Sequence, residues 1–147
     1  MKPLVYIAGP ISKGCQFSNV RRGCSLWEQL RQLGIDAYCP HWSAQQQFHA
    51  EISHADWLAY DTQVILPRCD ALFRMQGESS GADIEVEWMK EHGKPVFYEI
   101  SKLAEWYSQY DRNSDVFHGS RSLIGQIKRE IRPDFTDWAS QVGANVP

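Results

Sequence analysis

Short apolar runs alternate with helix-like segments along the first hundred residues, and this alternation restricts the fold more than any other feature of the sequence. The strand-like runs are Leu4–Ala8, 35–39, 70–75 and 95–100. Strands that alternate with helices favour a mainly parallel sheet covered on both faces, with right-handed crossovers. We therefore expect an α/β fold: a Rossmann-like or flavodoxin-like three-layer sandwich with a parallel sheet of four or five strands, followed by C-terminal helices.

The intervening segments have recognisable boundaries. A first helix is expected before Gly34 because apolar residues recur at helical spacing at Phe17, Val20, Cys24, Trp27 and Leu30. A second helix is expected from about residue 53 to 66, stopped by Pro67. Residues 41–50 are predicted to be a polar loop, which either covers a ligand or is an ordinary surface excursion.

The totals fit one globular domain. With 147 residues, of which 43% are hydrophobic, we expect a single domain over residues 1–147, with its core in about 1–100 and a helical extension over about 101–147. The net charge of -3 argues against polymeric nucleic acid as a partner, so any bound nucleotide should be small. No apolar run is long enough to span a membrane, and no signal-peptide segment precedes the first strand. The expected location is the cytosol.

Metal and cofactor chemistry find little support. The four cysteines show no CxxC spacing, so free thiols are expected. His49 and His54 flank Glu51 and Asp56, but a spacing of five lacks the i, i+4 geometry of a helical metal pair, and no metal is expected. The sequence also lacks the glycine-rich motifs of dinucleotide and P-loop nucleotide binding, and we expect no cofactor.

Glu85 is the unusual residue of the helix predicted between the last two strands. On a helical wheel it falls inside the apolar arc of Ile84, Val86, Trp88 and Met89, whereas Glu87 and the other charged residues lie on the opposite side. A carboxylate on a buried stripe must be hydrogen-bonded, paired or used chemically, because an isolated buried charge is costly. One interpretation is structural, with Glu85 partnered by a backbone donor or an arginine.

The other interpretation is chemical. Ser80 is the predicted N-cap of this helix, with Asp83 at the capping-box position, and Ser79, Ser80 and Gly81 place hydroxyls and amides at a helix N-terminus, which suits an anion such as phosphate. Asp61, on the preceding helix, offers a second carboxylate, although a solvated helix carboxylate is the simpler interpretation of that residue. Two carboxylates are the usual equipment for glycosyl transfer: one attacks the anomeric carbon and an acid assists the leaving group.

Five short motifs, in order over about residues 4 to 100, resemble the nucleoside 2-deoxyribosyltransferase superfamily. They are Tyr6-Ile7-Ala8-Gly9-Pro10, Trp57 with Asp61, Asp70-Ala71-Leu72, Ser79-x-Gly81-x-x-x-Glu85 and Gly93-Lys94-Pro95-Val96. The pattern is most similar to the branch of nucleoside 5'-monophosphate N-glycosidases.

The resemblance implies a role for each matching residue. Glu85 corresponds to the nucleophile that attacks C1', Asp61 to the carboxylate near base and sugar, and Tyr6 to an aromatic residue beside the sugar and the nucleophile. Gly9 corresponds to a turn that lets the substrate approach. Ser79 stands where the transferases commonly carry an aspartate and the phosphate-accepting hydrolases a serine. A hydroxyl there would bind a 5'-phosphate that a carboxylate would repel.

The sequence departs from the family pattern at several positions. Glu87 and Met89 replace small residues after the nucleophile, and Pro10 stands where some monophosphate hydrolases have a phosphate-binding serine, which leaves Ser12 or Lys13 as substitutes. The resemblance also implies a homodimer or larger homo-oligomer, with residues 106–110 as a candidate interface.

These observations predict an N-glycosidase that releases the base from a nucleoside 5'-monophosphate through a glycosyl-Glu85 intermediate. Asp61 is the expected acid or base-orienting group, and Tyr6 a positioner. Gly9, Pro10, Ser12, Ser79, Ser80 and Gly81 are expected to contact the substrate. The alternatives are a true deoxyribosyltransferase, in which a second base intercepts the intermediate, and a nucleotide-binding or sensing module without catalysis.

Overall fold

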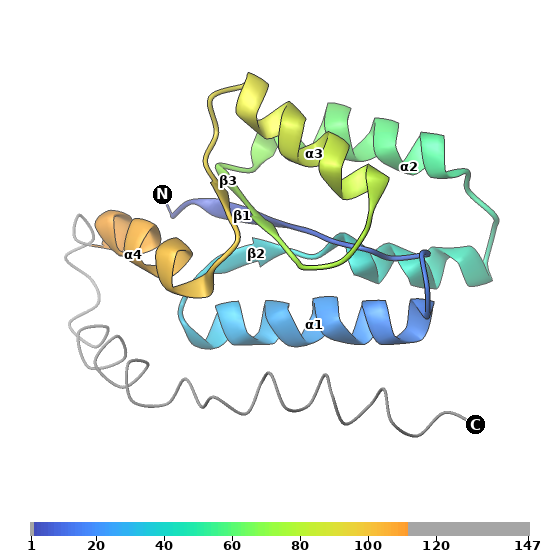
Figure 1. Cartoon of the computed structure of the whole chain (residues 1–147), viewed down its shortest axis with the longest axis horizontal. Coiled ribbons are helices and arrows are strands. Elements are labelled where there is room, and N and C mark those ends of the chain that lie inside the picture. The colour runs from blue at the N-terminus through green and yellow to red at the C-terminus, as the bar shows by residue number, and fades with distance from the viewer. Residues whose placement is uncertain (1, 112–147) are drawn as a thin grey trace. The chain divides into compact units, whose positions relative to one another are not determined.

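A computed structural model describes residues 2–111, and it has the predicted α/β architecture with a parallel sheet (Figure 1). The four strands are β1 (Leu4–Ala8), β2 (Asp36–Tyr38), β3 (Ala71–Arg74) and β4 (Val96–Phe97). The α-helices are α1 (Gln16–Gln32), α2 (His54–Tyr60), α3 (Ser80–Glu91) and α4 (Ile100–Asp111). Within residues 2–111 there are also three tighter or wider helical segments: η1 (Pro40–Phe48), η2 (Asp61–Ile65) and η3 (Leu66–Arg68).

The strands lie in the order β2-β1-β3-β4, and all three neighbouring pairs are parallel. Tyr6 on β1 is paired with Tyr38 on one side and Leu72 on the other, so the central strand is hydrogen-bonded along both edges. The four-stranded parallel sheet confirms the predicted fold class. Because β1 and β3 are neighbours, the loops that follow them start side by side at one edge of the sheet.

Helices cover both faces of the sheet. Figure 1 shows α1 below the sheet and α2 and α3 above it. Side chains alternate between these layers along β1. Val5 and Ile7 pack with Leu26, Leu30 and Leu103 from α1 and α4, in one buried cluster. Tyr6 and Ala8 point to the other face and pack with Leu66, Ala82, Val86 and Met89. Tyr6 therefore faces the layer that contains α3.

Several predicted boundaries were wrong in informative ways. The helix expected over residues 53–66 is three pieces: α2, a π turn and a 3-10 turn. Residues 41–50 are not an irregular loop, because most of them form the 3-10 helix η1. The fourth strand is shorter than the apolar run 95–100, since Ile100 already begins α4. These boundaries depend on interactions with neighbouring segments, which cannot be read from the local pattern of apolar residues.

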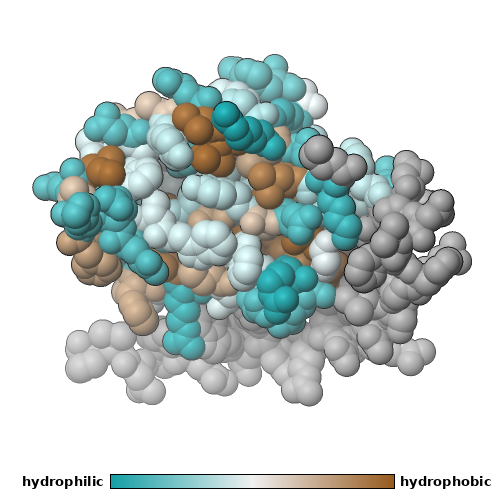
Figure 2. Space-filling model, turned by 180° about the vertical axis from the view of Figure 1, so that it is seen from behind, coloured by the Kyte–Doolittle hydropathy of each residue, from teal (hydrophilic) through white to brown (hydrophobic). Residues whose placement is uncertain are grey.

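The predicted apolar face of α1 was also partly wrong. Phe17 is 78% exposed, whereas α1 buries Asn19 and Gly23 together with Leu26 and Leu30. Polar and small residues occupy this stripe because they contact the loop after β1 and the ring of His41, as described below. Exposed apolar residues are dispersed, and on the face in Figure 2 brown apolar side chains are separated by polar ones.

Residues 112–147, which make up most of the helical extension expected over about 101–147, lie outside the described residues. Among residues 2–111, no helix combines the length and the apolar character that crossing a membrane requires.

Candidate functional site

Tyr6, Asp61 and Glu85 come from three different elements and meet beneath α3. Tyr6 lies in the middle of β1, Asp61 at the start of η2 and Glu85 on the inner face of α3. The hydroxyl of Tyr6 donates a hydrogen bond to Oε1 of Glu85 at 2.7 Å, and it also interacts with the carboxylate of Asp61. The structure thus brings together the three residues that were predicted to be catalytic.

Glu85 is buried, as its wheel position predicted, with 7% of its surface exposed. The centre of the buried face was misplaced, however. Ile84 is 48% exposed, and α3 buries Gly81, Ala82, Val86 and Met89 around Glu85. The small residues at positions 81 and 82 let the first turn of α3 lie close to its neighbours. A wheel weighted by hydrophobicity does not detect such a contact.

The helix also begins one residue earlier than predicted. Ser79 is the N-cap, because its Oγ accepts a hydrogen bond from the backbone amide of Ala82. Ser80 is the first helical residue and is exposed. Asp83 does not act as a capping-box residue. Its carboxylate forms a salt bridge with the buried Arg74, with a distance of 2.8 Å from Nη2 to Oδ1.

The structural interpretation of Glu85 predicted an arginine or a backbone donor as its partner. Arg74 instead uses its guanidinium on Asp83 and on the carbonyls of Met75 and Gly77. Within residues 2–111, Glu85 forms no salt bridge, and its hydrogen bond comes from the Tyr6 hydroxyl. A phenol hydroxyl is neutral, so it can hydrogen-bond to the buried Glu85 carboxylate but cannot neutralise its charge.

Asp61 faces inward because the helix changes its winding there. The α-helix α2 ends at Tyr60 and continues as the π turn η2, and Asp61 is 8% exposed. Such π turns occur frequently at functional sites. The simpler interpretation of Asp61, a solvated helix carboxylate, is wrong.

Burial dominates the electrostatics of the pair. Burial raises the pKa of Glu85 to about 8, although the hydrogen bond from Tyr6 acts in the opposite direction. Burial also raises the pKa of Asp61 to about 6, again opposed by Tyr6. The pKa of Tyr6 is raised well above its ordinary value by burial and then by the two carboxylates, so Tyr6 stays a donor. Between about pH 6 and about pH 8, Asp61 and Glu85 together hold one proton.

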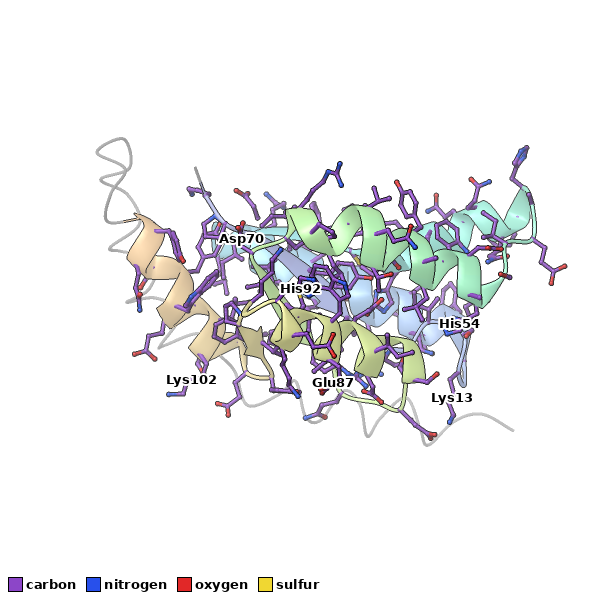
Figure 3. All side chains as sticks on the ribbon, turned by 90° about the horizontal axis from the view of Figure 1, so that it is seen from above. Lys13, His54, Asp70, Glu87, His92 and Lys102 are labelled. Atoms are coloured by element: carbon purple, nitrogen blue, oxygen red, sulfur yellow. The ribbon has the colours of Figure 1, made fainter. Side chains whose placement is uncertain are left out.

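The N-terminus of α3 has an unexpected neighbour, His54. A Cβ atom built on Gly81 would lie 3.0 Å from Cε1 of His54, so the imidazole covers the first turn of the helix. Figure 3 shows His54 and Lys13 at the same end of the molecule, the end at which α3 begins. Gly81 therefore provides space for a ring as well as a free amide.

The loop after β1 lies beside the segment that leads to α3. Gly9 packs against Met75, where a Cβ atom would approach the methionine Sδ to 2.9 Å. Pro10 is buried and lies next to Gly77, whose positive φ of +120° suits glycine. Ser12 is exposed, and Lys13 forms a salt bridge with Glu78. The two loops therefore border one another, as expected.

A hollow of about 890 Å³ lies beside this cluster. Its walls come from β2, η1 and α2 and include Tyr38, Trp42, Trp57 and Tyr60. The ring of Tyr38, on the wall of this hollow, stacks on that of Tyr6 with centroids 5.9 Å apart, and Tyr6 contacts Glu85. A second hollow, of about 500 Å³, lies on the other flank of α3 between Arg74, Asp83 and Tyr98. Neither is the crevice between Gly9-Pro10 and Ser79-Ser80-Gly81 that was predicted.

Sequence reasoning missed three residues around the site: Tyr38, His41 and His54. Tyr38 was assigned only to a strand, and His41 only to a loop. Their contacts join segments distant in sequence, so no local pattern reveals them. The signal that was available was the polar segment after β2 with Trp42 in it, which was interpreted as a possible ligand cover.

In the part of the chain that the structure describes, no three histidine, cysteine or acidic side chains gather in a way that would hold a metal ion. The cysteines within these residues are free thiols.

A comparison with models of protein families finds no match for this chain, and a comparison with curated protein sequences finds none either.

Proposed function

We propose that this protein is an N-glycosidase that hydrolyses the bond between base and sugar in a nucleoside 5'-monophosphate. The observation that carries the proposal is the contact of Tyr6 with the buried Glu85, beside the buried Asp61. A pair of carboxylates with unequal proton affinity is the equipment that glycosyl transfer requires. The resemblance of the sequence motifs to the deoxyribosyltransferase superfamily supports the same reaction.

The reaction would proceed in two displacements. Glu85 attacks C1' of the sugar, the bond from C1' to the base nitrogen breaks, and its electron pair leaves with the base. Asp61, when it holds the shared proton, transfers it to the base. Water then attacks C1' and gives a proton to the Asp61 carboxylate, while the bond from C1' to the Glu85 oxygen breaks; this releases the sugar phosphate and restores the Glu85 carboxylate. The Tyr6 hydroxyl holds one oxygen of Glu85 and leaves Oε2 to react.

The proton distribution of the free protein must change for this chemistry. With pKa values of about 8 for Glu85 and about 6 for Asp61, the shared proton lies mainly on Glu85. The reactive form has that proton on Asp61 and a carboxylate at Glu85. Both forms carry the same net charge, so the transfer needs no proton from solvent. The Tyr6 hydroxyl donates to Glu85 and can accept from a protonated Asp61, and this chain of two hydrogen bonds provides a route for exchange.

This arrangement predicts a bell-shaped dependence of kcat/KM on pH. Activity should rise as the doubly protonated pair loses a proton near pH 6, and fall as the second proton leaves near pH 8. The measurement is initial rates of base release from pH 5 to 9 at low substrate concentration. In Asp61→Asn the pair can no longer share a proton, so the limb near pH 8 should disappear. A flat profile in the parent would contradict a shared proton.

The N-terminus of α3 would bind the 5'-phosphate. Ser79 caps the helix with its hydroxyl, and the amides of the first turn are free of intrahelical partners by geometry. The imidazole of His54 lies over Gly81 and can add a donor. These groups favour a dianion, and they would give a nucleoside without phosphate fewer contacts.

Ser79→Asp should reverse this preference. Aspartate caps helices as well as serine does, so the fold is retained, but its charge opposes a phosphate dianion. We expect kcat/KM for the monophosphate to fall about 100-fold, while that for the matching nucleoside changes less than about threefold. Ser79→Asn is the matched control, because it caps the helix without charge and should lose much less. Equal losses in Asp and Asn variants would place the phosphate elsewhere.

The aromatic hollow would hold the base. Tyr38, Trp57 and Tyr60 offer π faces, and Gln45, Gln46 and Ser43 offer hydrogen bonds to the edge of a heterocycle. A base in this hollow would lie against the ring of Tyr38, which stacks on Tyr6, the residue that contacts Glu85.

The proposal is tested by incubating the protein with ribo- and 2'-deoxynucleoside 5'-monophosphates of each common base, and with the corresponding nucleosides, and separating free base by chromatography. Release of base from at least one monophosphate, faster than from its nucleoside, is the expected result. Faster base exchange than hydrolysis, when a second free base is added, would identify a transferase. Tight nucleotide binding without base release would identify a binding module instead.

A further inference from the structure

The loop after β1 is held by two buried polar side chains that play no part in the chemistry described above. Nε2 of His41 lies 3.2 Å from the carbonyl oxygen of Pro10. Nδ2 of Asn19 donates to the carbonyls of Ile11 and Lys13, at 3.1 and 2.7 Å. His41 is completely buried, and Asn19 is 7% exposed. Three of the four carbonyls from residue 10 to residue 13 are thus tied to the interior.

The contacts of His41 define its tautomer. A carbonyl oxygen can only accept, so Nε2 must carry the hydrogen that is donated to Pro10. Nδ1 is then an acceptor, and it lies 3.7 Å from the Sγ of Cys39, whose thiol can donate. Burial lowers the pKa of His41 to about 4, and burial raises the pKa of Cys39 to about 12. At neutral pH the ring is therefore neutral and the thiol keeps its hydrogen.

The ring has no room to move. A Cβ atom built on Gly23 would lie 2.4 Å from Cγ of His41, which means that the imidazole occupies the place of a side chain on α1. This explains why glycine stands on the buried stripe of α1. The η1 segment is locked against α1 through this contact, and Pro10 is fixed to both.

The tethers orient the opposite edge of the loop. In a trans peptide the N–H points away from the preceding C=O, and the described residues contain no cis peptide. With the carbonyls of Pro10, Ile11 and Lys13 turned inward, the amides of Ile11, Ser12 and Gly14 turn away from the interior. None of these three amides donates a hydrogen bond to residues 2–111. The salt bridge of Lys13 with Glu78 keeps this loop beside the start of α3.

We propose that His41 is a positioning residue: by donating from Nε2 to Pro10 it holds the loop so that its outward amides bind the anionic group of the ligand together with Ser79. Asn19 assists through the next two carbonyls. The identity of the anion as a substrate phosphate rests on the proposed function, but the orientation of the loop by His41 does not.

The direct test uses inorganic phosphate as the probe and ¹⁵N-labelled protein. Phosphate is expected to shift the amide resonances of Ile11, Ser12 and Gly14. His41→Leu, which fills a similar space without a donor, should weaken phosphate binding about tenfold. His41→Gln restores a donor at a comparable reach and should stay within about threefold of the parent. Unchanged phosphate affinity in His41→Leu would overturn the proposal.

A spectroscopic readout separates positioning from simple structural support. Long-range ¹H–¹⁵N correlation spectra of the parent should show His41 with its hydrogen on Nε2 and Nδ1 unprotonated, and a hydrogen on Nδ1 would overturn the proposal. If His41→Leu does not fold, as judged by circular dichroism, the proposal is decided by phosphate binding of His41→Gln and by the tautomer of His41 in the parent. Asn19→Ala should weaken phosphate binding in the same direction.

The activity measurement distinguishes this proposal from the proposed function. If the parent protein releases base, His41→Leu should raise KM for the monophosphate about tenfold while kcat changes less than about threefold. Loss in kcat alone would contradict a role in anion binding. If the parent releases no base but phosphate still shifts the loop amides in a His41-dependent way, the positioning role stands and the proposed reaction fails.

Discussion

Glu85→Gln is expected to lower kcat/KM for base release at least about 1,000-fold, because the amide cannot attack C1' and no second carboxylate occupies its place. The substitution keeps the shape of the side chain, and its carbonyl oxygen can still accept the hydrogen bond from Tyr6. The fold should therefore be retained. The measurement is the rate of base release from the best monophosphate, with active protein quantified by nucleotide binding.

The matched control for this variant is Glu87→Gln. Glu87 lies two residues further along α3, is exposed and pairs with Lys90, and Figure 3 shows it on the outer side of the helix. The same chemical change there should leave kcat/KM within about twofold, since exposed helix ion pairs contribute little. Equal loss in both variants, or full activity in Glu85→Gln, would remove Glu85 from the mechanism.

The second large effect is on stability, and Glu85→Gln should make the protein more stable at alkaline pH. The folded pKa of Glu85, about 8, lies above the ordinary value of 4.5, so the native state binds a proton that the unfolded state has released between these limits. By linkage, the stability of the parent falls as pH rises from about 4.5 to about 8. Glutamine does not titrate, so the variant avoids this loss and should gain roughly 4 kcal/mol at pH 8.

The test is urea unfolding of parent and variant at several pH values. The difference in free energy of unfolding should be small at pH 4.5 and should increase towards pH 8. His41 contributes a slope of the opposite sign, because its lowered pKa destabilises the native state below about pH 6.5, but it is present in both proteins and cancels. Glu87→Gln should show no such increase. A difference that does not depend on pH would mean that Glu85 is not protonated in the native state.

These two effects belong together physically. A carboxylate that is buried at a cost to stability, and whose removal stabilises the chain, is typical of a functional group retained for chemistry. A carboxylate in a structural ion pair behaves in the opposite way, since removal of one partner leaves the other uncompensated. In this protein that description fits Arg74 and Asp83, which lies two residues before Glu85 on α3.

Much of this arrangement follows from the sequence, because strand and helix alternation and the inward position of Glu85 depend on local periodicity. The resemblance to the deoxyribosyltransferase superfamily implied that Tyr6, Asp61 and Glu85 would lie at one site, and the structure brings the three residues together. The N-cap differed by one residue, Ser79 for Ser80, because both serines are good capping residues and the sequence alone does not distinguish between them.

Other features could not be predicted because they depend on contacts between distant segments. The π turn that turns Asp61 inward, the 3-10 winding of η1 and the burial of His41 against Gly23 have no local signature. The aromatic hollow is formed by β2, η1 and α2 together, and its residues were assigned separately to a strand, a loop and a helix. The spacing of apolar residues predicts which face of a helix is buried, but it does not predict which segments pack against that face.

The most direct measurement is mass spectrometry of the protein quenched during turnover of a 2'-fluoro-2'-deoxynucleoside 5'-monophosphate, whose fluorine slows breakdown of a glycosyl intermediate. We expect one equivalent of free base and an adduct with the mass of the fluorinated sugar phosphate on the peptide that contains Glu85. The adduct should be absent from Glu85→Gln and present in Glu87→Gln. Base release without an adduct at Glu85, or an adduct on another residue, would contradict the assignment of Glu85 as the nucleophile.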